Sequence, residues 1–463
     1  MHSWGGREGG RGGSRPNRHG RIPPDAGGTP RLHRNGSEEA VDPHFQLVSG
    51  HATARTCKEA AGFRGALRPT PVQAADLLPR TRPHPDFPRP NGRAFLFLRV
   101  TRRSPGPRLL AGALAALAVA VAGVRAAGEP EPLWAYGFLT PPAPGETAPL
   151  PRPPARPQRP APAGDEQTRP RHVPGSQATF SLAQIRDARN AVDWFPGDHP
   201  PMPPVVVHGP VALGDATRAC ASCHLPSGRG RPENAPLAGQ PVAYLLRQLQ
   251  DFRSGARHTI DPRKGNTPIM IALAACLTDE EAKAAAAYFS AIAWTLWTRV
   301  VETDLVPPTR LSGNLFLPVA SARTEPIAGR IIEVPEDVDQ AETLRNPRSG
   351  FVAYVPVGSV RRGEFLVKTG GMTVVDGAIV PGPTTACATC HGPDLMGLAD
   401  VPGIAGRSPS YLVRQLYDLQ QGSRHGASAP LMQPVVAKLT GDEMTAIAAY
   451  VASLAPPVAS ASR

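Results

Sequence analysis

The stretch Cys220-Ala-Ser-Cys-His224 recurs as Cys387-Ala-Thr-Cys-His391, and these two motifs organise the rest of the chain. Two thiols three positions apart can form thioether bonds to the two vinyl groups of a haem, and the adjacent imidazole can reach the iron. A thiol redox pair or half a zinc site also uses Cys-x-x-Cys, but neither requires the trailing histidine. We therefore predict two covalently attached haem c groups. Their binding residues are Cys220, Cys223 and His224 for the first and Cys387, Cys390 and His391 for the second.

An internal repeat surrounds both motifs. Residues 238–258 match residues 405–425 at an offset of 167, which is also the offset between the two motifs. Farther along the chain, an offset of 162 continues the match to the end of the second copy. A repeat of this length indicates two copies of one structural unit. We predict a mainly α-helical fold with two tandem domains, residues 176–299 (the first domain) and residues 358–463 (the second domain).

Helix signals recur within each copy. Apolar side chains at helical spacing predict helices over 244–252 and 411–419, each followed by a glycine. A last helix begins at a capping box in both copies, Thr278-x-x-Glu281 and Thr440-x-x-Glu443. The remaining predictions are helices over 180–194 and 358–370 and a loop over 371–385.

Two other segments accompany the repeat. Residues 300–357 (the strap) contain β-branched runs at 330–334 and 350–357, so we expect short strands there, in a segment too small and polar to predict as a domain. Residues 127–175 form a Pro-rich linker that begins with an apolar patch at 133–138. This patch can dock on a folded domain.

The N-terminal region shows no sign of a folded domain and contains a segment typical of export signals. Residues 1–99 are rich in Arg, Gly and Pro without periodicity, and we expect them to be disordered. Residues 100–126 read as a secretory signal, with a basic start, an apolar run over 109–124 and small residues at the end. Because this signal begins so late, we interpret residues 1–99 as a misassigned upstream extension, with translation beginning near Val100. The apolar run has 16 residues, fewer than the roughly 20 that span a bilayer, so we favour cleavage and a periplasmic protein over a membrane anchor.

The charge distribution and the two remaining cysteines limit the classes of function that the chain can have. The net charge of +12 arises entirely within the first 126 residues, so the rest of the chain is neutral and we predict no nucleic-acid partner. Cys57 and Cys276 lie outside the motifs in unrelated contexts, which does not suggest a disulfide. We expect Cys57 to be absent from the mature protein and Cys276 to be a small, partly buried side chain, with a redox or ligand role as the alternative.

The second axial ligand decides whether each haem is open or closed. Met270 and Met432 follow a Pro-x pair in both copies, 46 residues after His224 and 41 after His391. Thioether sulfur is a known haem ligand, so we predict these methionines as ligands. His258 and His425 rank second, and unmatched rivals are Met202, Met372 and Met396. We predict that Arg257 and Arg424 pair with haem propionates, with an ordinary surface role as the alternative.

Together the motifs, the Tyr-Leu-x-Arg-Gln-Leu segments, the Pro-x-Met loops and the closing Ala-Tyr helices resemble the dihaem cytochrome c4 group of class I c-type cytochromes. The resemblance covers about residues 205–295 and 358–455. It implies two small helical domains that pass electrons between haems, ligated by His224 with Met270 and by His391 with Met432. It also implies that a proline carbonyl orients each proximal imidazole. Pro402 matches this position, whereas Pro236 lies one residue closer to the following glycine.

These features favour an electron carrier over an enzyme. Its donor and acceptor would be redox proteins such as a periplasmic dehydrogenase, a copper protein or a terminal oxidase, and peripheral association with a membrane stays open. A dihaem peroxidase is one alternative, but it needs an open iron. A thiosulfate-oxidising dihaem enzyme could use Cys276 as a ligand, although Lys438 stands at the matching position of the second copy. A third alternative is the cytochrome subunit of a larger dehydrogenase.

Overall fold

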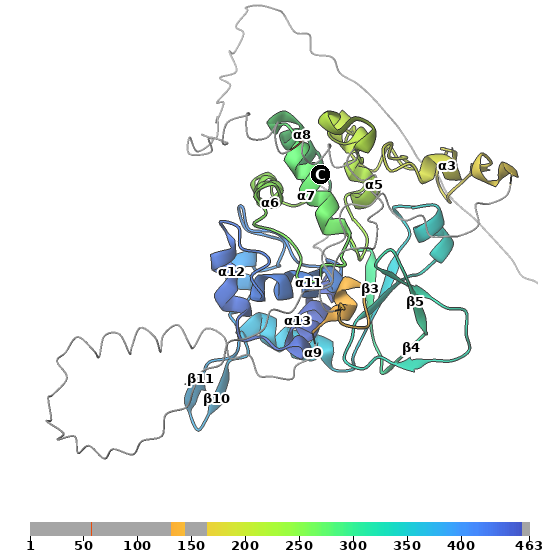
Figure 1. Ribbon diagram of the computed structural model, residues 1–463. Coiled ribbons are helices and arrows are strands. Elements are labelled where there is room, and N and C mark those ends of the chain that lie inside the picture. Colours follow the sequence, from red (N-terminus) through yellow and green to blue (C-terminus); the bar gives the residue numbers. More distant parts are fainter. Residues whose placement is uncertain (1–56, 58–130, 144–163, 456–463) are drawn as a thin grey trace, which may run out of the picture. The chain divides into compact units, whose positions relative to one another are not determined.

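The computed structural model describes residue 57, residues 131–143 and residues 164–455 (Figure 1). The expected disorder of residues 1–99 and the expected signal over 100–126 therefore fall outside the described residues, apart from Cys57. Most of the Pro-rich linker falls outside them as well. Among the described helices, none is long and apolar enough to cross a bilayer.

The first domain is built from short helices, one of which carries its motif (Figure 1). The predicted helix over 244–252 is confirmed as α6, which ends at Gly255 with a φ of +79°. The predicted capping box is also confirmed, because Thr278 Oγ1 accepts from Glu281 N at 3.1 Å and Thr278 N donates to Glu281 Oε2 at 2.8 Å. The elements are α4 (Pro204–His208), η3 (Val211–Ala216), α5 (Cys220–His224), α6 (Val242–Ser254), α7 (Asn266–Cys276) and α8 (Asp279–Ser290).

The second domain repeats this plan with a closer helix pair. The predicted helix over 358–370 is confirmed as α9, and α13 packs against it at Gly363. A Cβ on Gly363 would come within 2.0 Å of Ala446 O, so this approach requires glycine. The capping box of Thr440 and Glu443 opens α13 as predicted. The helices are α9 (Ser359–Thr369), α10 (Ala388–His391), α11 (Pro409–Gln420), α12 (Ala429–Val436) and α13 (Gly441–Ser453).

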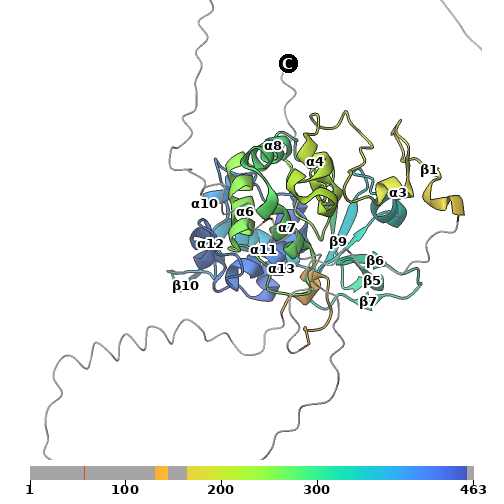
Figure 2. The same ribbon diagram turned by 45° about the horizontal axis from the view of Figure 1, so that its top comes forward.

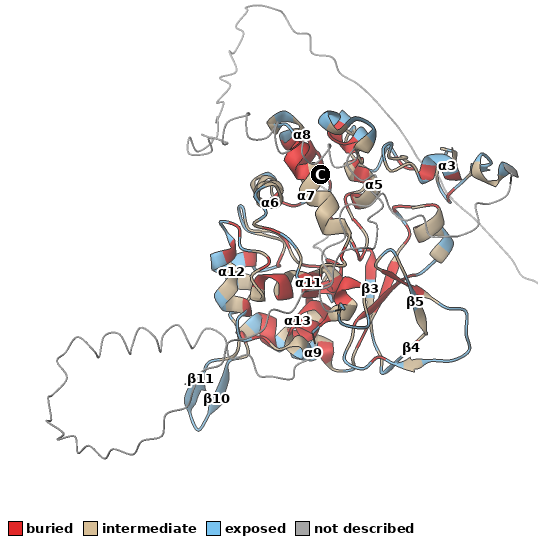
Figure 3. Ribbon diagram, in the orientation of Figure 1, coloured by how far each residue is buried: buried red, intermediate tan, exposed pale blue. Residues whose placement is uncertain are grey.

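Residues 371–385, predicted as a loop, contain an antiparallel hairpin of β10 (Thr373–Val375) and β11 (Ala378–Val380). Its two turn residues, Asp376 and Gly377, have φ of 51° and 76°. An Asp-Gly pair between apolar runs is a strong hairpin signal, but the Gly and Pro residues that flank the segment favour a loop. Every strand residue of the hairpin is exposed (Figure 3).

The strap is more than a connection, because it folds around a small apolar core of its own. β3 and β9 pair in parallel and β8 pairs antiparallel with β9, which confirms the two predicted strand regions. Figures 1 and 2 show these strands gathered beside the helices. The core consists of Val306, Phe316, Ile327, Ile332 and Val334. The elements are β3 (Thr298–Glu302), β4 (Leu305–Val306), β5 (Thr309–Ser312), β6 (Leu315–Pro318), β7 (Glu325–Pro326), β8 (Ile332–Pro335), the π-helical turn η4 (Asp339–Thr343) and β9 (Phe351–Val355).

Side chains of the strap also join the cores of both domains. Phe351 and Leu317 belong to the apolar cluster of the first domain, whereas Ala353 and Val355 belong to that of the second. Both residues of each pair are nearly inaccessible to water. Burial of this kind is the main favourable term in domain association, so the strap holds the two domains together.

The apolar patch at 133–138 docks as predicted. It forms the short 3-10 helix η1 (Leu133–Tyr136), and Ala135 and Tyr136 are buried in the apolar cluster of the second domain. The Tyr136 hydroxyl donates to Asp418 Oδ1 at 2.8 Å. Docking of this segment therefore satisfies a buried carboxylate of α11 as well as covering apolar surface.

The predicted helix over 180–194 is wrong beyond its first turn. Only α3 (Leu182–Ile185) forms, because the carboxylate of Asp187 accepts from Arg189 N at 3.0 Å and from Asn190 Nδ2 at 2.7 Å. Such local side-chain bonds compete with helix propagation. The neighbouring elements are η2 (Gly164–Gln167), β1 (Pro170–Arg171) and β2 (Phe180–Ser181).

The expectation that Cys57 and Cys276 are unpaired is also wrong. The structure joins them in a disulfide across 219 residues of sequence, with their Cα atoms 4.8 Å apart. Cys276, expected to be partly buried, is fully buried at the end of α7. A pairing over such a distance leaves no trace in sequence spacing, which explains the error. Because its sulfur is bonded to Cys57, Cys276 is not available as a haem ligand.

Candidate haem sites

Both motifs occupy a single helical turn with the same arrangement. In the first domain α5 consists of the motif itself, and in the second α10 begins one residue after Cys387. One turn brings the third and fourth positions next to the first, so both thiols and the imidazole can address one group. A residue with a positive φ ends each turn. Gly392 takes this role in the second domain with φ +82°, and Leu225 takes it in the first with φ +62°.

Each motif histidine is held by one backbone carbonyl. His224 Nδ1 lies 2.8 Å from Ala235 O, and His391 Nδ1 lies 2.8 Å from Pro402 O. The contact implied for Pro402 is confirmed, whereas in the first domain Ala235 provides the carbonyl in place of Pro236. Ala235 and Pro402 are separated by the same 167 residues as the motifs, so the backbone position is kept although the residue type differs.

Burial controls the chemistry of these side chains. It lowers the pKa of both His224 and His391, which favours the neutral imidazole. With Nδ1–H donating to a carbonyl, Nε2 keeps its lone pair for a metal. Burial also raises the pKa of Cys220 to about 12 and that of Cys387 to about 11. These two thiols are therefore protonated, unlike the activated thiolate of a dithiol redox enzyme.

The four motif cysteines carry no disulfide. Two free thiols beside a neutral imidazole with an available Nε2 fit covalently bound haem c, which takes two thioether bonds and an axial nitrogen. Each domain offers the same donor atoms, two cysteine Sγ atoms and one histidine Nε2. The described residues thus meet the requirements of the group at both motifs.

The predicted methionines lie on matching helices. Met270 is in α7 and Met432 is in α12, so the Pro-x-Met segments are helical and not the loops expected, and both methionines are partly buried. Of the rivals, Met372 is exposed, Met202 packs against the core of the first domain, and Met396 packs against both cores. Ligation by Met270 and Met432 remains a prediction that repeat position and side-chain chemistry support.

The rival histidines lie together at the contact between the domains. The rings of His258 and His425 are 6.0 Å apart and both side chains are exposed. Their backbones exchange matching hydrogen bonds, because His258 N donates to Ser423 O at 2.9 Å and His425 N donates to Ala256 O at 2.8 Å. Each bond is the repeat image of the other, so the two domains meet about a local two-fold axis.

The two arginines predicted to bind propionates belong to the same contact. Arg257 donates to Gln248 at 2.7 Å and to Gln415 at 2.8 Å. Arg424 donates to Gln415 at 3.1 Å and to Gln248 at 2.9 Å. Structure thus gives both arginines a role between the domains that sequence reasoning missed. Their exact match in the repeat was the available signal.

Gln240 and Arg407 also lie in this interface, at matching positions of the repeat, although they are different residue types. Gln240 exchanges two hydrogen bonds with the backbone of Gly403, at 2.8 and 3.0 Å. Its counterpart Arg407 donates to Ala238 O at 2.9 Å and stacks over Trp294 at 3.9 Å. Arg407 is only 1% exposed, and burial lowers its pKa to about 9.

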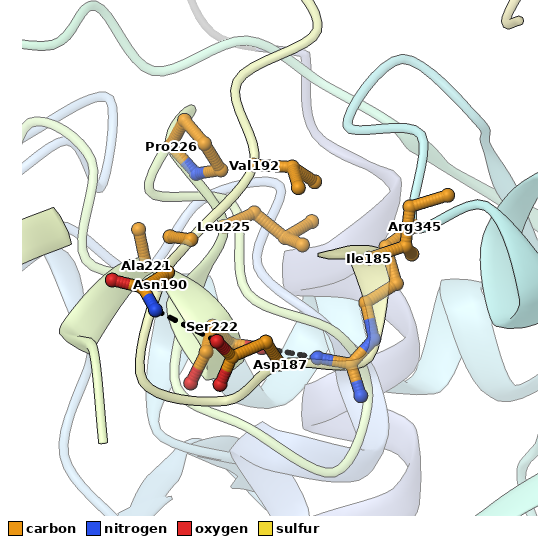
Figure 4. Close-up of a pocket in the computed structure, with 10 residues that line it drawn as sticks. Ile185, Asp187, Asn190, Val192, Ala221, Ser222, Leu225, Pro226 and Arg345 are labelled. Atoms are coloured by element: carbon orange, nitrogen blue, oxygen red, sulfur yellow. Dashed lines mark hydrogen bonds between the residues drawn. The ribbon is translucent and has the colours of Figure 1, made fainter. Parts of the chain in front are cut away.

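The surroundings of the two motifs differ. In the first domain the strap reaches the motif, where Arg345 Nη1 donates to Ser222 O at 2.9 Å. Figure 4 shows the pocket that Arg345, Ser222 and Asp187 line beside the motif. In the second domain Cys390 is exposed, and the hairpin ends seven residues before Cys387.

Comparison with known proteins agrees with this geometry. The family model described as Cytochrome c matches residues 212–292 and 382–455, one match for each motif. The thiosulfate dehydrogenase electron acceptor of Stutzerimonas stutzeri is 28% identical over 245 residues, which cover 52% of this chain and 80% of that protein. Cytochrome c4 of Pseudomonas aeruginosa is 25% identical over 251 residues, 53% of this chain and 89% of that protein. Cytochrome c-554(548) of Halomonas halodenitrificans is 38% identical over 68 residues, 14% of this chain and 82% of that protein.

Proposed function

The chain belongs to the cytochrome c family and is cytochrome c4-like, and from that premise we propose that it is a periplasmic carrier moving single electrons between two redox proteins. Each cytochrome c domain binds one haem c covalently. The observation that carries the proposal is the duplicated donor set. Two neutral imidazoles are held at 2.8 Å by equivalent carbonyls, and an equivalent methionine follows in each domain.

We assign His224 and Met270 as axial ligands in the first domain and His391 and Met432 in the second. When bound, haem supplies reversible one-electron chemistry at iron, with a potential raised by thioether ligation. The protein contributes orientation, since Ala235 O and Pro402 O fix the tautomer and ring plane of each histidine. Ligands on both faces leave no position for a substrate, which argues for a carrier over a peroxidase.

The contact between the domains supports transfer within the molecule. Reciprocal hydrogen bonds of Arg257 and Arg424 and the buried pair of Gln240 and Arg407 hold the domains in one arrangement. A fixed arrangement keeps the distance between the two haems constant. A guanidinium group has five N–H donors, so Arg257 and Arg424 can pair with a haem propionate, as predicted from the sequence, in addition to bonding the two glutamines.

Two matched variants test the ligand assignment. Met270→Ala and Met432→Ala should each remove about half of the thioether-to-iron charge-transfer absorption at the red edge of the oxidised spectrum. Met372→Ala is the control, because Met372 is exposed and has no repeat partner. Peroxide turnover, or an unaltered band in either variant, would contradict the proposal.

A dehydrogenase is the donor class with the most direct support. The relative from Stutzerimonas stutzeri is named as the electron acceptor of a thiosulfate dehydrogenase, and 80% of its length matches this chain. We propose a periplasmic dehydrogenase of this kind as donor, with this chain as its acceptor or subunit. Reduction of the oxidised protein by a thiosulfate dehydrogenase and thiosulfate, followed by haem absorbance, tests this choice. Absence of reduction would favour another donor.

A further inference from the structure

The β10–β11 hairpin exposes apolar side chains that no described part of the chain covers. Val374 and Ile379 are 68% and 69% exposed, and Val375 and Val380 are 53% and 41% exposed. Figure 1 shows the hairpin extending away from α9 and α12, and Figure 3 shows both strands exposed. A lone two-stranded hairpin is marginally stable in water, and natural proteins guard exposed strands with charge. Asp376, at the turn, is the single charged residue between 371 and 385.

The base of the hairpin is tightly fixed. A Cβ on Gly382 would lie 2.0 Å from Gly370 O, so the two ends of the hairpin segment cross at a distance that only glycine allows. Just beyond this crossing, Thr384 Oγ1 donates to Val435 O of α12 at 2.8 Å. Cys387 N then donates to Val367 O of α9 at 2.9 Å. The hairpin is therefore anchored to the helix that carries Met432 and to the start of the second motif.

Both faces of the hairpin are apolar. Cross-strand pairing places Val374 opposite Ile379 on one face, and Val375 opposite Ala378 on the other. Edge-to-edge pairing with a second copy of the chain would leave both faces in water. A groove that encloses the hairpin would cover both faces. Because the hairpin is nearly free of charge, such a groove should be neutral and apolar.

We propose that the hairpin is a docking arm that inserts into a neutral, apolar groove of the redox partner serving the second domain. This inference rests on the proposed function and names the surface through which electrons enter or leave. The first domain offers no equivalent, because residues 204–218, which match the hairpin segment in the repeat, form α4 and η3. Its motif also contacts the strap through Arg345 and Ser222.

The experiment compares the haem-loaded wild type with a Val374→Lys, Ile379→Lys double variant. Electron exchange with an extract of the native cells is followed by stopped-flow haem absorbance. Two lysines in an apolar groove should slow exchange by about tenfold or more. Reduction by dithionite should not change, since a small reductant needs no docking. Val211→Lys is the matched control, because Val211 is 82% exposed and occupies the place of Ala378 in the repeat.

The possible outcomes separate the arm from the carrier function. Exchange at the wild-type rate by the double variant overturns the docking arm and leaves the carrier function intact. A wild-type dimer in sedimentation that the double variant loses assigns the hairpin to a second copy, and overturns the inference as well. Absence of exchange by the wild type overturns the proposed function itself. An unchanged visible spectrum verifies that each variant is folded.

Discussion

The two domains share the geometry of their donor atoms but differ in the segments that reach the two motifs. In both, an imidazole Nδ1 lies 2.8 Å from a carbonyl eleven residues farther along the chain. In the first domain the motif is tied to the strap through Arg345, and Cys223 is half-buried. In the second domain Cys390 is exposed, and an apolar hairpin ends seven residues before the motif. The donor atoms are thus the same in both copies, whereas the segments beside the motifs differ and change the access to each site.

The first prediction concerns the equivalence of the two attachment sites. Replacing Cys220 and Cys223 by Ala, or Cys387 and Cys390 by Ala, should remove one of two covalently bound haems, because each thiol pair holds one group. Intact mass should fall by one haem in either variant, and haem absorbance should halve. The unaltered domain serves as the control within each variant. Loss of both haems from one double variant would contradict independent sites.

The second prediction compares the stability lost on replacing Arg407 and Gln240, which are different residues at matching positions of the interface. Arg407→Ala should lower the free energy of unfolding by about 2–4 kcal/mol, because carbonyl bonds and a stack over Trp294 are lost from a buried site. Gln240→Ala should cost about 1–2 kcal/mol, since a smaller group with two hydrogen bonds is removed. Guanidinium unfolding of the haem-loaded protein measures both. Arg407 also donates to Pro236 O at 3.3 Å. Equal costs would mean that this bond and the stack over Trp294 contribute nothing.

The third prediction addresses the contact of the strap with the first motif. Arg345→Ala leaves Ser222 O without this donor and should cost about 1–3 kcal/mol of unfolding free energy. It should also shift the absorption or potential of the first haem alone. Arg323→Ala is the control, because Arg323 is an exposed arginine of the same strap. An equal shift at both haems would show that Arg345 acts on the whole molecule.

The fourth and smallest effect is a pH dependence carried by the strap. Glu333 Oε2 accepts from Ser408 Oγ at 2.7 Å, and burial raises the pKa of Glu333 above its usual 4.5. Between pH 4.5 and that raised value the folded state binds the extra proton, so stability falls as pH rises through this window. Glu333→Gln should flatten this part of the melting-temperature profile. Glu336→Gln, at a more exposed strap carboxylate, is the matched control for removing a carboxylate from the strap.

Periodic and duplicated features were predictable from the sequence, whereas long-range pairings were not. Helices α6 and α13, the strands at 332–335 and 351–355 and the docking of Tyr136 follow from local pattern. The Cys57–Cys276 disulfide and the strap core depend on residues far apart in the chain.

Some features of the candidate haem sites were likewise predictable from the sequence, and others were not. Both motifs and their carbonyl partners follow one repeat offset. The resemblance referred to a proline, and Pro236 is displaced by one residue, so the sequence did not identify Ala235 as the partner in the first domain. Asp187 ended a helix that its apolar spacing favoured, because its carboxylate bonds locally. The interface of Gln240 and Arg407 has no periodic signature of its own.

Coordination of the two irons is the point on which the carrier account depends. Electron paramagnetic resonance of the oxidised, haem-loaded protein at neutral pH measures it directly, because spin state follows axial ligation. We predict two low-spin ferric signals of equal intensity, both of the histidine–methionine type. A high-spin ferric signal from either domain would reveal an open coordination position and contradict the account.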